Sequence, residues 1–315
     1  MIRFPATALR GSLACLLVGA VAMGLARPAS AQTSTADPFK DKRYMSGHRD
    51  VLPPEIPDEL KDADAMTRIR GVKRIIACAD PFAFPSSEMT DKATGYDVDL
   101  LQAIAKDEGW ETFYIWVNTA GRGGMNRAFR TSIRKGICDV FLGLGTGGME
   151  DILGKSKLSL LAPAFGVSYV LATYDPALKG KTLDDLAKAK TPTGATYFSP
   201  TDTFLTERGV AHETFPQSRR AIEAMAQGKV QAVLVPSTML ADARRDFPER
   251  EIFVLESFAP KSMDMEWNST WATKKSETAL REFLETRIAQ YGTTGRLKSI
   301  LGDYGIPYVA PSSGR

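Results

Sequence analysis

The chain has 315 residues, of which 43% are hydrophobic and 24% are charged. This is enough apolar material for two lobes of ordinary size, and it excludes both a small disulfide-stapled scaffold and a wholly disordered chain. The formal net charge is +3, and residues 1–31 contain three arginines and no acidic residue. Without these three, 37 of the 40 lysines and arginines remain against 37 acidic residues. We therefore expect neither nucleic acid nor an anionic membrane as the main partner.

Residues 1–31 have the pattern of a secretory signal peptide. Arg3 and Arg10 form the positively charged start, residues 11–25 form the apolar stretch, and the small residues 29–31 predict cleavage after Ala31. A membrane anchor fits less well, because the apolar run has only about 15 residues and a spanning helix needs about 20. We expect an exported protein, periplasmic in a bacterium, without a membrane anchor.

Export leaves Cys78 and Cys138 as a pair of cysteines in an oxidising compartment. A disulfide is the ordinary outcome there. However, if Cys78 ends one parallel strand and Cys138 begins its neighbour, they lie about four residues out of register, beyond the roughly 7 Å that a bridge allows between α-carbons. A disulfide and two buried thiols both remain open.

The pattern of elements changes near residue 71. Residues 32–70 are rich in proline and charge and predict an irregular N-terminal arm. Strands are then expected at 72–79, 113–117 and 138–144, separated by amphipathic helices that end at Gly109 and Gly136. Such alternation predicts a mostly parallel sheet with helices on its faces.

The second half repeats this plan. A capping box at 182–185 opens a helix, and segments 132–144 (SIRKGICDVFLGL) and 224–236 (AMAQGKVQAVLVP) share a helix end, a glycine and an apolar strand. Two similar extended segments, 168–173 and 268–273, predict that the chain crosses out of a first lobe and back into it. We expect lobe 1 at 71–168 and 268–315 and lobe 2 at 169–267, joined by two hinge strands.

Several motifs resemble those of a known family. They are Gly95-Tyr96-Asp97-Val98-Asp99-Leu100, Lys135-Gly136-x-Cys138-Asp139-Val140, Leu178-Lys179-Gly180-Lys181 and the closing helices. Together they resemble bacterial extracellular solute-binding proteins of the polar amino acid class, solute-binding protein family 3. The resemblance covers about residues 72–305. It implies an α/β fold of the type II periplasmic binding protein kind, with two α/β lobes joined by two hinge strands.

A narrower set of motifs is similar to the MxaJ and XoxJ type proteins that accompany quinoprotein methanol dehydrogenases. The set is Cys78-Ala79-Asp80-Pro81, Pro85-Ser86, Tyr114-x-Trp116, Arg122 with Arg127, Gly136-x-Cys138-Asp139-Val140, and Ser168-Tyr169-Val170. This resemblance implies a periplasmic accessory protein that acts on a PQQ-dependent methanol or alcohol dehydrogenase. The expected partner is that dehydrogenase or its cytochrome c, and the expected state is a monomer without a cofactor.

The charged anchors of amino acid receptors are missing. Such receptors usually carry an arginine after the third strand, which grips the ligand carboxylate, and an aspartate after the buried strand of the second lobe, which holds the ammonium group. Here the corresponding stretches are Thr-Gly-Gly-Met-Glu-Asp at 146–151 and Val235-Pro236-Ser237. A zwitterion would be desolvated without compensation, so we expect a ligand other than a free amino acid.

Candidate binding residues follow the expected strand ends, where open parallel sheets bind ligands. They are Asp80, Phe82, Phe84, Tyr96, Arg122, Gly143, Gly145, Thr146, Ser199, Thr201, Asp202 and Ser237. Simpler alternatives remain: core packing for the aromatics, a helix cap for Ser199–Thr203, and a solvated helix start for Arg122. The glycines at 143–148 match a dinucleotide motif, but they follow the third strand without a partner acid, which favours a flexible loop.

Catalysis and metal binding are poorly supported by the sequence. The only histidines are His48 and His212, and the adjacent Glu150 and Asp151 diverge by about 100° on a helix. No clustered ligands suit a metal. Lys188, Lys190, Arg244 and Arg245 are expected on solvated helix faces. We expect a non-catalytic protein that docks a partner segment in the cleft or on its rim. The alternatives are a transporter receptor for a small non-amino-acid solute and, further off, a dehydratase-type enzyme.

Overall fold

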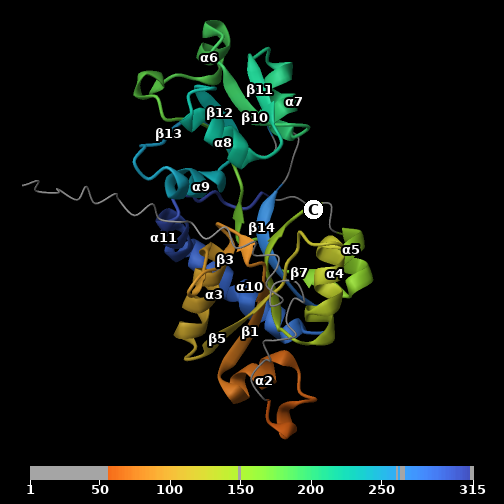
Figure 1. The fold of residues 1–315 in the computed structure, drawn as a ribbon. Helices are drawn as coiled ribbons and strands as arrows, with labels where there is room; N and C mark the ends of the chain where they lie inside the picture. Colours follow the sequence, from red (N-terminus) through yellow and green to blue (C-terminus); the bar gives the residue numbers. More distant parts are fainter. Residues whose placement is uncertain (1–55, 148–149, 260–261, 263–266, 313–315) are drawn as a thin grey trace, which may run out of the picture. The chain divides into compact units, whose positions relative to one another are not determined.

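The computed structural model describes residues 56–147, 150–259, 262 and 267–312, all within the compact unit 38–315. The predicted signal peptide and most of the predicted arm lie outside the described residues. No helix in the described part of the chain is long and apolar enough to cross a membrane. The alternation of strands and helices that the sequence predicts is present, and it forms two large, separate sheets beside a small third one (Figure 1).

The first sheet has the order β5-β1-β6-β14-β7, with β8 also paired to β14. Its parallel strands are β1 (Arg74–Ala79), β5 (Glu111–Trp116) and β6 (Val140–Gly145). The strand β14 (Asn268–Lys274) runs antiparallel to β6, β7 (Leu158–Leu160) and β8 (Phe165–Gly166). The chain thus returns to this sheet through β14, as the crossover pattern predicts.

Alternate residues of β1 face two different cores, as expected for a strand buried on both faces. Ile75 and Ala77 pack beneath α2 (Ala65–Val72), α3 (Tyr96–Asp107), α10 (Thr278–Thr293) and α11 (Arg296–Asp303). Ile76 and Cys78 pack beneath α4 (Gly124–Thr131), η3 (Ile133–Lys135) and α5 (Glu150–Ser156). The C-terminal helices pack on the first sheet as predicted.

The second sheet has the order β11-β10-β12-β9-β13. Its parallel strands are β10 (Thr193–Thr196), β11 (His212–Phe215) and β12 (Ala232–Pro236), and β9 (Tyr169–Thr173) runs antiparallel between β12 and β13 (Phe253–Phe258). The strands β6 and β12 have equivalent neighbours in the two sheets. β6 lies between the parallel strand β1 and the antiparallel strand β14, and β12 lies between the parallel strand β10 and the antiparallel strand β9. The repeat at 132–144 and 224–236 therefore marks equivalent places in the two sheets.

Helices cover both faces of the second sheet. α6 (Leu183–Ala189) and α7 (Pro200–Glu207) pack on one face, and α8 (Ser218–Ala226) and α9 (Met239–Asp246) pack on the other. The predicted capping box is present, since the Thr182 and Asp185 side chains each accept from the other's backbone N–H. The remaining short elements are η2 (Asp58–Leu60), η4 (Pro176–Leu178) and a small sheet of β2 (Phe82–Ala83), β3 (Ser87–Met89) and β4 (Ala93–Thr94).

The prediction of an irregular arm was wrong at its end, where α2 forms. Asp64 caps this helix by accepting from the Thr67 N–H at 3.0 Å, and Met66 and Ile69 are buried against the first sheet. An eight-residue helix with a charged exposed side has too short an apolar pattern to stand out from its polar surroundings.

Cys78 and Cys138 form a disulfide, with their α-carbons 5.7 Å apart. The geometric objection to this bridge was wrong, because Cys138 is not in the ladder. Cys78 pairs with Phe141, and β6 begins only at Val140. The chain turns at Gly136, whose φ is +72°, and the Asp139 N–H then donates to the Ile76 carbonyl of β1 at 2.8 Å, so Cys138 lies beside β1 before the ladder begins.

Loss of the disulfide should destabilise the first lobe. The bridge joins residues 60 apart in the sequence, so replacing both cysteines by alanine should lower the free energy of unfolding by about 2–4 kcal/mol. Urea unfolding with and without dithiothreitol measures this. The reductant should destabilise the native sequence but leave the double variant unchanged; equal stability of the oxidised and reduced native protein would contradict the prediction.

Candidate functional site

The carboxyl ends of the parallel strands lie at one edge of each sheet. We call the residues that follow β1, β5 and β6 the first edge, and those that follow β10 and β12 the second edge. Asp80 begins the first edge and is buried. Its Oδ1 accepts from the Phe82 N–H at 2.8 Å, and its Oδ2 accepts from the Thr119 N–H at 2.7 Å. Asp80 therefore joins the turns after β1 and β5, and both its oxygens are engaged by the protein.

The three predicted aromatic residues of the first edge have different surroundings. Phe82 on β2 is 41% exposed, whereas Tyr96 is 6% exposed. The Tyr96 ring packs edge-on against Phe165, with centroids 5.3 Å apart, so the core-packing alternative describes it. Phe84 is partly buried against Tyr304. Of the three, Phe82 presents the largest exposed fraction.

A buried carboxyl group lies behind the first edge. Asp97 is 1% exposed; it accepts from the Ser86 hydroxyl at 2.7 Å and from the Trp271 indole N–H at 2.5 Å. Burial raises the pKa of Asp97 to about 7, although these two donors and the Gly143 N–H oppose the rise. A Cβ on Gly143, whose φ is +73°, would lie 2.6 Å from Ser86 Oγ. The predicted residue Gly143 thus makes room for this buried cluster.

The other predicted residues of the first edge join β6 to β14 or face solvent. Thr146 donates its N–H to the Asn268 carbonyl at 2.9 Å, and its Oγ1 accepts from the Asn268 N–H at 3.0 Å. Trp267 occupies the space beside Gly145, where a Cβ would lie 2.4 Å from the indole nitrogen. Arg122 is exposed, and its carbonyl accepts from the Arg127 side chain at 3.3 Å. Gly148, the last residue of the predicted glycine loop, lies outside the described residues.

The second edge is dominated by a helix cap, the alternative that the sequence left open. Ser199 caps α7 and its Oγ lies 2.7 Å from Oγ1 of Thr201, which is buried. Ser237, after β12, is fully buried; its N–H donates to the Ser168 carbonyl at 2.7 Å, and its Oγ has no hydrogen-bond partner in the part of the chain that the structure describes. The hydroxyl of Ser237 is therefore enclosed by protein.

An aromatic pair that the sequence analysis missed projects from the second edge. Tyr197 and Phe198 follow β10, are 55% and 84% exposed, and have ring centroids 3.8 Å apart. Phe198 has a φ of +51°, which is costly for a bulky residue. Asp202 holds this turn, because its carboxylate accepts from the Phe198 N–H at 3.0 Å and lies 3.0 Å from His212 Nε2. The only sequence signal was a Tyr-Phe dipeptide before the Ser-Pro cap.

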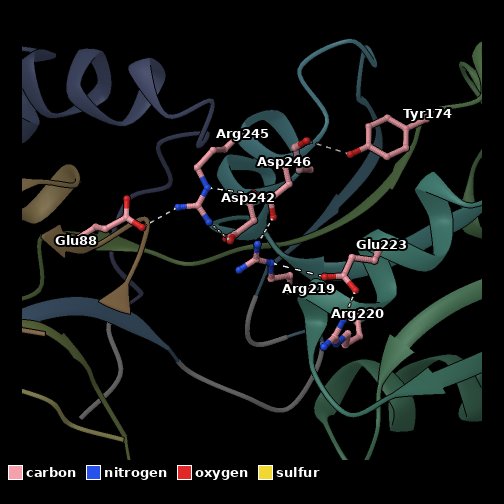
Figure 2. A network of polar contacts seen from close by, with 9 residues as sticks. Glu88, Tyr174, Arg219, Arg220, Glu223, Asp242, Arg245 and Asp246 are labelled. Atoms are coloured by element: carbon pink, nitrogen blue, oxygen red, sulfur yellow. Dashed lines mark hydrogen bonds and ion pairs between the residues drawn. The ribbon is translucent and has the colours of Figure 1, made fainter. Parts of the chain in front are cut away.

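Arg245 of α9 connects the second lobe to the small sheet of the first (Figure 2). Its guanidinium lies 3.2 Å from Glu88 and 3.3 Å from Asp242, and 3.7 Å above the ring of Phe84. Arg245 is exposed, as expected for a solvated helix face, but it also makes contacts with the first lobe that the sequence did not predict. A polar helix pattern does not show what lies opposite the helix, and an arginine can stack on a ring and pair with acids at once.

The two edges combine engaged carboxyl groups with exposed aromatic rings. In the described part of the chain, no group of three or more histidine, cysteine or acidic side chains could hold a metal ion. The carboxyl group of Asp97 is enclosed by the core, and those of Asp80 and Asp202 accept from backbone N–H groups. Exposed aromatic rings at both edges offer apolar contact area, which suits an apolar or aromatic ligand or a protein segment.

Comparisons with known proteins support the fold. No family model matches the chain, and no curated protein does. Among solved structures, it is similar to the L-cystine solute receptor of Neisseria gonorrhoeae, with 16% identity, a TM-score of 0.61, and coverage of 78% of this chain and 99% of that one. It is also similar to substrate-binding domain 2 of Lactococcus lactis GlnP, with 19% identity, a TM-score of 0.58, and coverage of 74% and 95%.

A third similar structure is the substrate-binding protein of a polar amino acid ABC uptake transporter from Streptococcus thermophilus. Its identity is 14%, its TM-score is 0.59, and the match covers 78% of this chain and 91% of that one. Identities this low show the fold alone. The chain has the fold of the type II periplasmic binding proteins, with two α/β lobes; these neighbours are named as a substrate-binding domain, a solute receptor and a substrate-binding protein.

The raised pKa of Asp97 predicts a pH dependence of stability. The folded protein keeps a proton on Asp97 up to a pH of about 7, while the unfolded chain loses it near 3.8. The folded state therefore binds more protons between these values, and its stability falls as the pH rises through this window, by at most about 1.4 kcal/mol per pH unit. Asp97→Asn should gain stability relative to the native protein between pH 5 and pH 8 in urea unfolding. Asp184→Asn, an exposed control, should not; equal pH dependence of Asp97→Asn and the native protein would contradict the prediction.

Removal of Arg245 should shift the titration of its neighbour. Burial raises the pKa of Asp242 to about 6, and the adjacent Arg245 cation opposes this rise. Arg245→Met should therefore raise the pKa of Asp242 further, as measured by NMR titration of the labelled carboxyl carbon. Arg244→Met is the matched control and should leave the titration unchanged. A pKa of Asp242 that does not move in Arg245→Met would argue against this ion pair.

Proposed function

We propose that this chain is an exported, non-catalytic binding protein whose ligand is not a free amino acid. The observation that carries the proposal is the set of exposed aromatic side chains at the strand ends, Phe82 on the first edge and the Tyr197–Phe198 pair on the second. The stretch where amino acid receptors carry a binding arginine, 146–151, has no arginine, and the stretch where they carry a binding aspartate, 235–237, has no aspartate. An aromatic surface binds apolar or flat groups and does not compensate the two charges of a zwitterion.

Two ligands of different kinds fit this proposal. The first is an extended segment of a quinoprotein methanol or alcohol dehydrogenase, or of its cytochrome c, held by an accessory protein of the MxaJ and XoxJ type. The sequence motifs around Asp80 and Cys138 support it. So does the aromatic pair, since tyrosine and phenylalanine are frequent anchors of protein interfaces. Docking would take place at the aromatic residues of the two edges.

The second candidate is a small uncharged or anionic solute, delivered to an ABC transporter. One of the solved structures that this fold resembles is named as the substrate-binding protein of an ABC uptake transporter, and two others as a substrate-binding domain and a solute receptor, so the comparisons lie nearer to this function. A dehydratase-type reaction has no support from the acidic residues of the two edges.

Replacement of the aromatic pair tests the docking function. A pull-down with the tagged mature chain from cells grown on an alcohol should recover a quinoprotein dehydrogenase. The Tyr197→Ser/Phe198→Ser double variant should recover about tenfold less of it, because aromatic anchors contribute most of the energy of an interface. Val254→Ser is the control, since Val254 is 45% exposed on β13 of the same lobe. Binding of the purified dehydrogenase, measured by calorimetry, should change in the same way.

Recovery of permease and ATPase subunits without a dehydrogenase would favour the receptor function. Saturable binding of a free amino acid by the purified chain, monitored by tryptophan fluorescence, would contradict the proposal as a whole.

A further inference from the structure

A basic hollow lies in the first lobe, away from both edges. It is lined by Arg134, Ser156, Lys157, Lys274, Lys275 and Ser276, and its volume is about 430 Å³. Four of these side chains are cationic, two carry hydroxyl groups, and none is acidic. Lys274 is the last residue of β14, and Thr273 pairs with Val140, the first residue of β6. The hollow therefore lies at the end of the sheet opposite to the first edge.

The backbone fixes the positions of these cations. Lys274 pairs with Leu158 across the β14 and β7 ladder, and the Lys275 N–H donates to the Lys157 carbonyl at 2.9 Å. Arg134 approaches from η3, on a separate segment. A Cβ on Gly136 would lie 2.9 Å from Lys274 Nζ, so the glycine leaves room for the ammonium group. Three segments thus bring their positive charges to one place.

These positive charges are not neutralised by direct ion pairs. In the described part of the chain, none of the four cationic side chains has an ion pair or a side-chain hydrogen bond. The acids nearby are engaged elsewhere: Glu277, which lines a neighbouring hollow with Lys274, accepts from the Ala65 N–H at 2.8 Å, and Asp139 pairs with Arg68. Like charges that converge without a counter-charge repel one another. A bound anion would remove this repulsion.

A buried hydroxyl group points to the same conclusion. Ser156 lines the hollow but is only 1% exposed, and its Oγ has no hydrogen-bond partner among the described residues. A buried hydroxyl without a partner costs free energy, and buried polar groups are nearly always paired. The C-terminal end of a helix attracts cations, which accounts for the basic residues near the C-terminal end of α5. It does not account for the unpaired hydroxyl beside them.

We propose that this hollow binds an oxyanion with two or more negative charges, of the phosphate or polycarboxylate kind. The lysine ammonium groups supply point charges, Arg134 supplies a two-pronged donor, and Ser156 donates its hydroxyl to an anion oxygen. The volume exceeds that of a single phosphate, so the hollow has room for a hydrated phosphate or a tricarboxylate. The site is independent of the binding function proposed for the two edges.

Calorimetric titration of the mature chain with inorganic phosphate, and separately with citrate, tests the proposal at constant ionic strength set with sodium chloride. We expect saturable binding of one ion per chain. Arg134→Gln and Lys275→Gln, which alter exposed side chains, should each weaken binding about tenfold, since each removes one charge-assisted contact. Ser156→Ala should weaken it about threefold by removing a hydrogen bond. Lys188→Gln, an exposed lysine of the other lobe, is the matched control and should bind as the native protein does.

The outcomes distinguish a specific anion site from a general attraction of anions to basic side chains. Saturable binding that Arg134→Gln and Lys275→Gln weaken and Lys188→Gln does not would support the site; binding of citrate alone would restrict it to carboxylates. Absence of saturation up to tens of millimolar of either ion, or equal weakening by all three substitutions, would overturn it. Recovery of the dehydrogenase should be the same for Lys275→Gln and the native chain, so failure of either proposal leaves the other intact.

Discussion

The structure of the first lobe depends on one buried strand, β14. All but its last residue are buried, and it fills the position between β6 and β7. At its start, Asn268 binds Thr146 of the first edge; in its middle, the Trp271 indole donates to Asp97; and at its end, Lys274 reaches the basic hollow. A strand buried on both faces must pair its backbone polar groups within the protein, and the same strand links the candidate site, the core and the hollow.

This arrangement explains why several predicted binding residues are occupied by the protein itself. Asp80, Gly143, Thr146 and Ser199 hold turns and helix starts together, and their polar groups pair with neighbouring backbone or side-chain groups. Phe82 and the Tyr197–Phe198 pair are exposed on this framework. The first set positions the edges and the second presents a surface. This division is common in proteins in which loops carry function on a rigid scaffold.

The fold was predictable from the sequence because its signals are local and repeated. Each of these signals depends on a few neighbouring residues: the capping box at Thr182, the glycines that end helices, and the similar segments 132–144 and 224–236. The disulfide, the Arg245 contacts and the exposed aromatic pair depend on where distant segments meet. A turn at Gly136 decides whether Cys138 reaches Cys78, and only the position of α9 against the small sheet gives Arg245 its partner Glu88. Hydrophobic periodicity carries no information on such pairs.

The place of β14 in the sheet also constrains how the chain can assemble. β6 and β7 follow one another in the sequence, yet the sheet places β14, more than a hundred residues later, between them. Until that strand is available, both neighbours expose unpaired backbone edges, and the core beneath α10 cannot close. The second sheet contains only strands from β9 to β13 and can complete itself earlier. The first lobe is therefore finished from the C-terminus, and a chain shortened before residue 268 would retain one intact sheet and one open one.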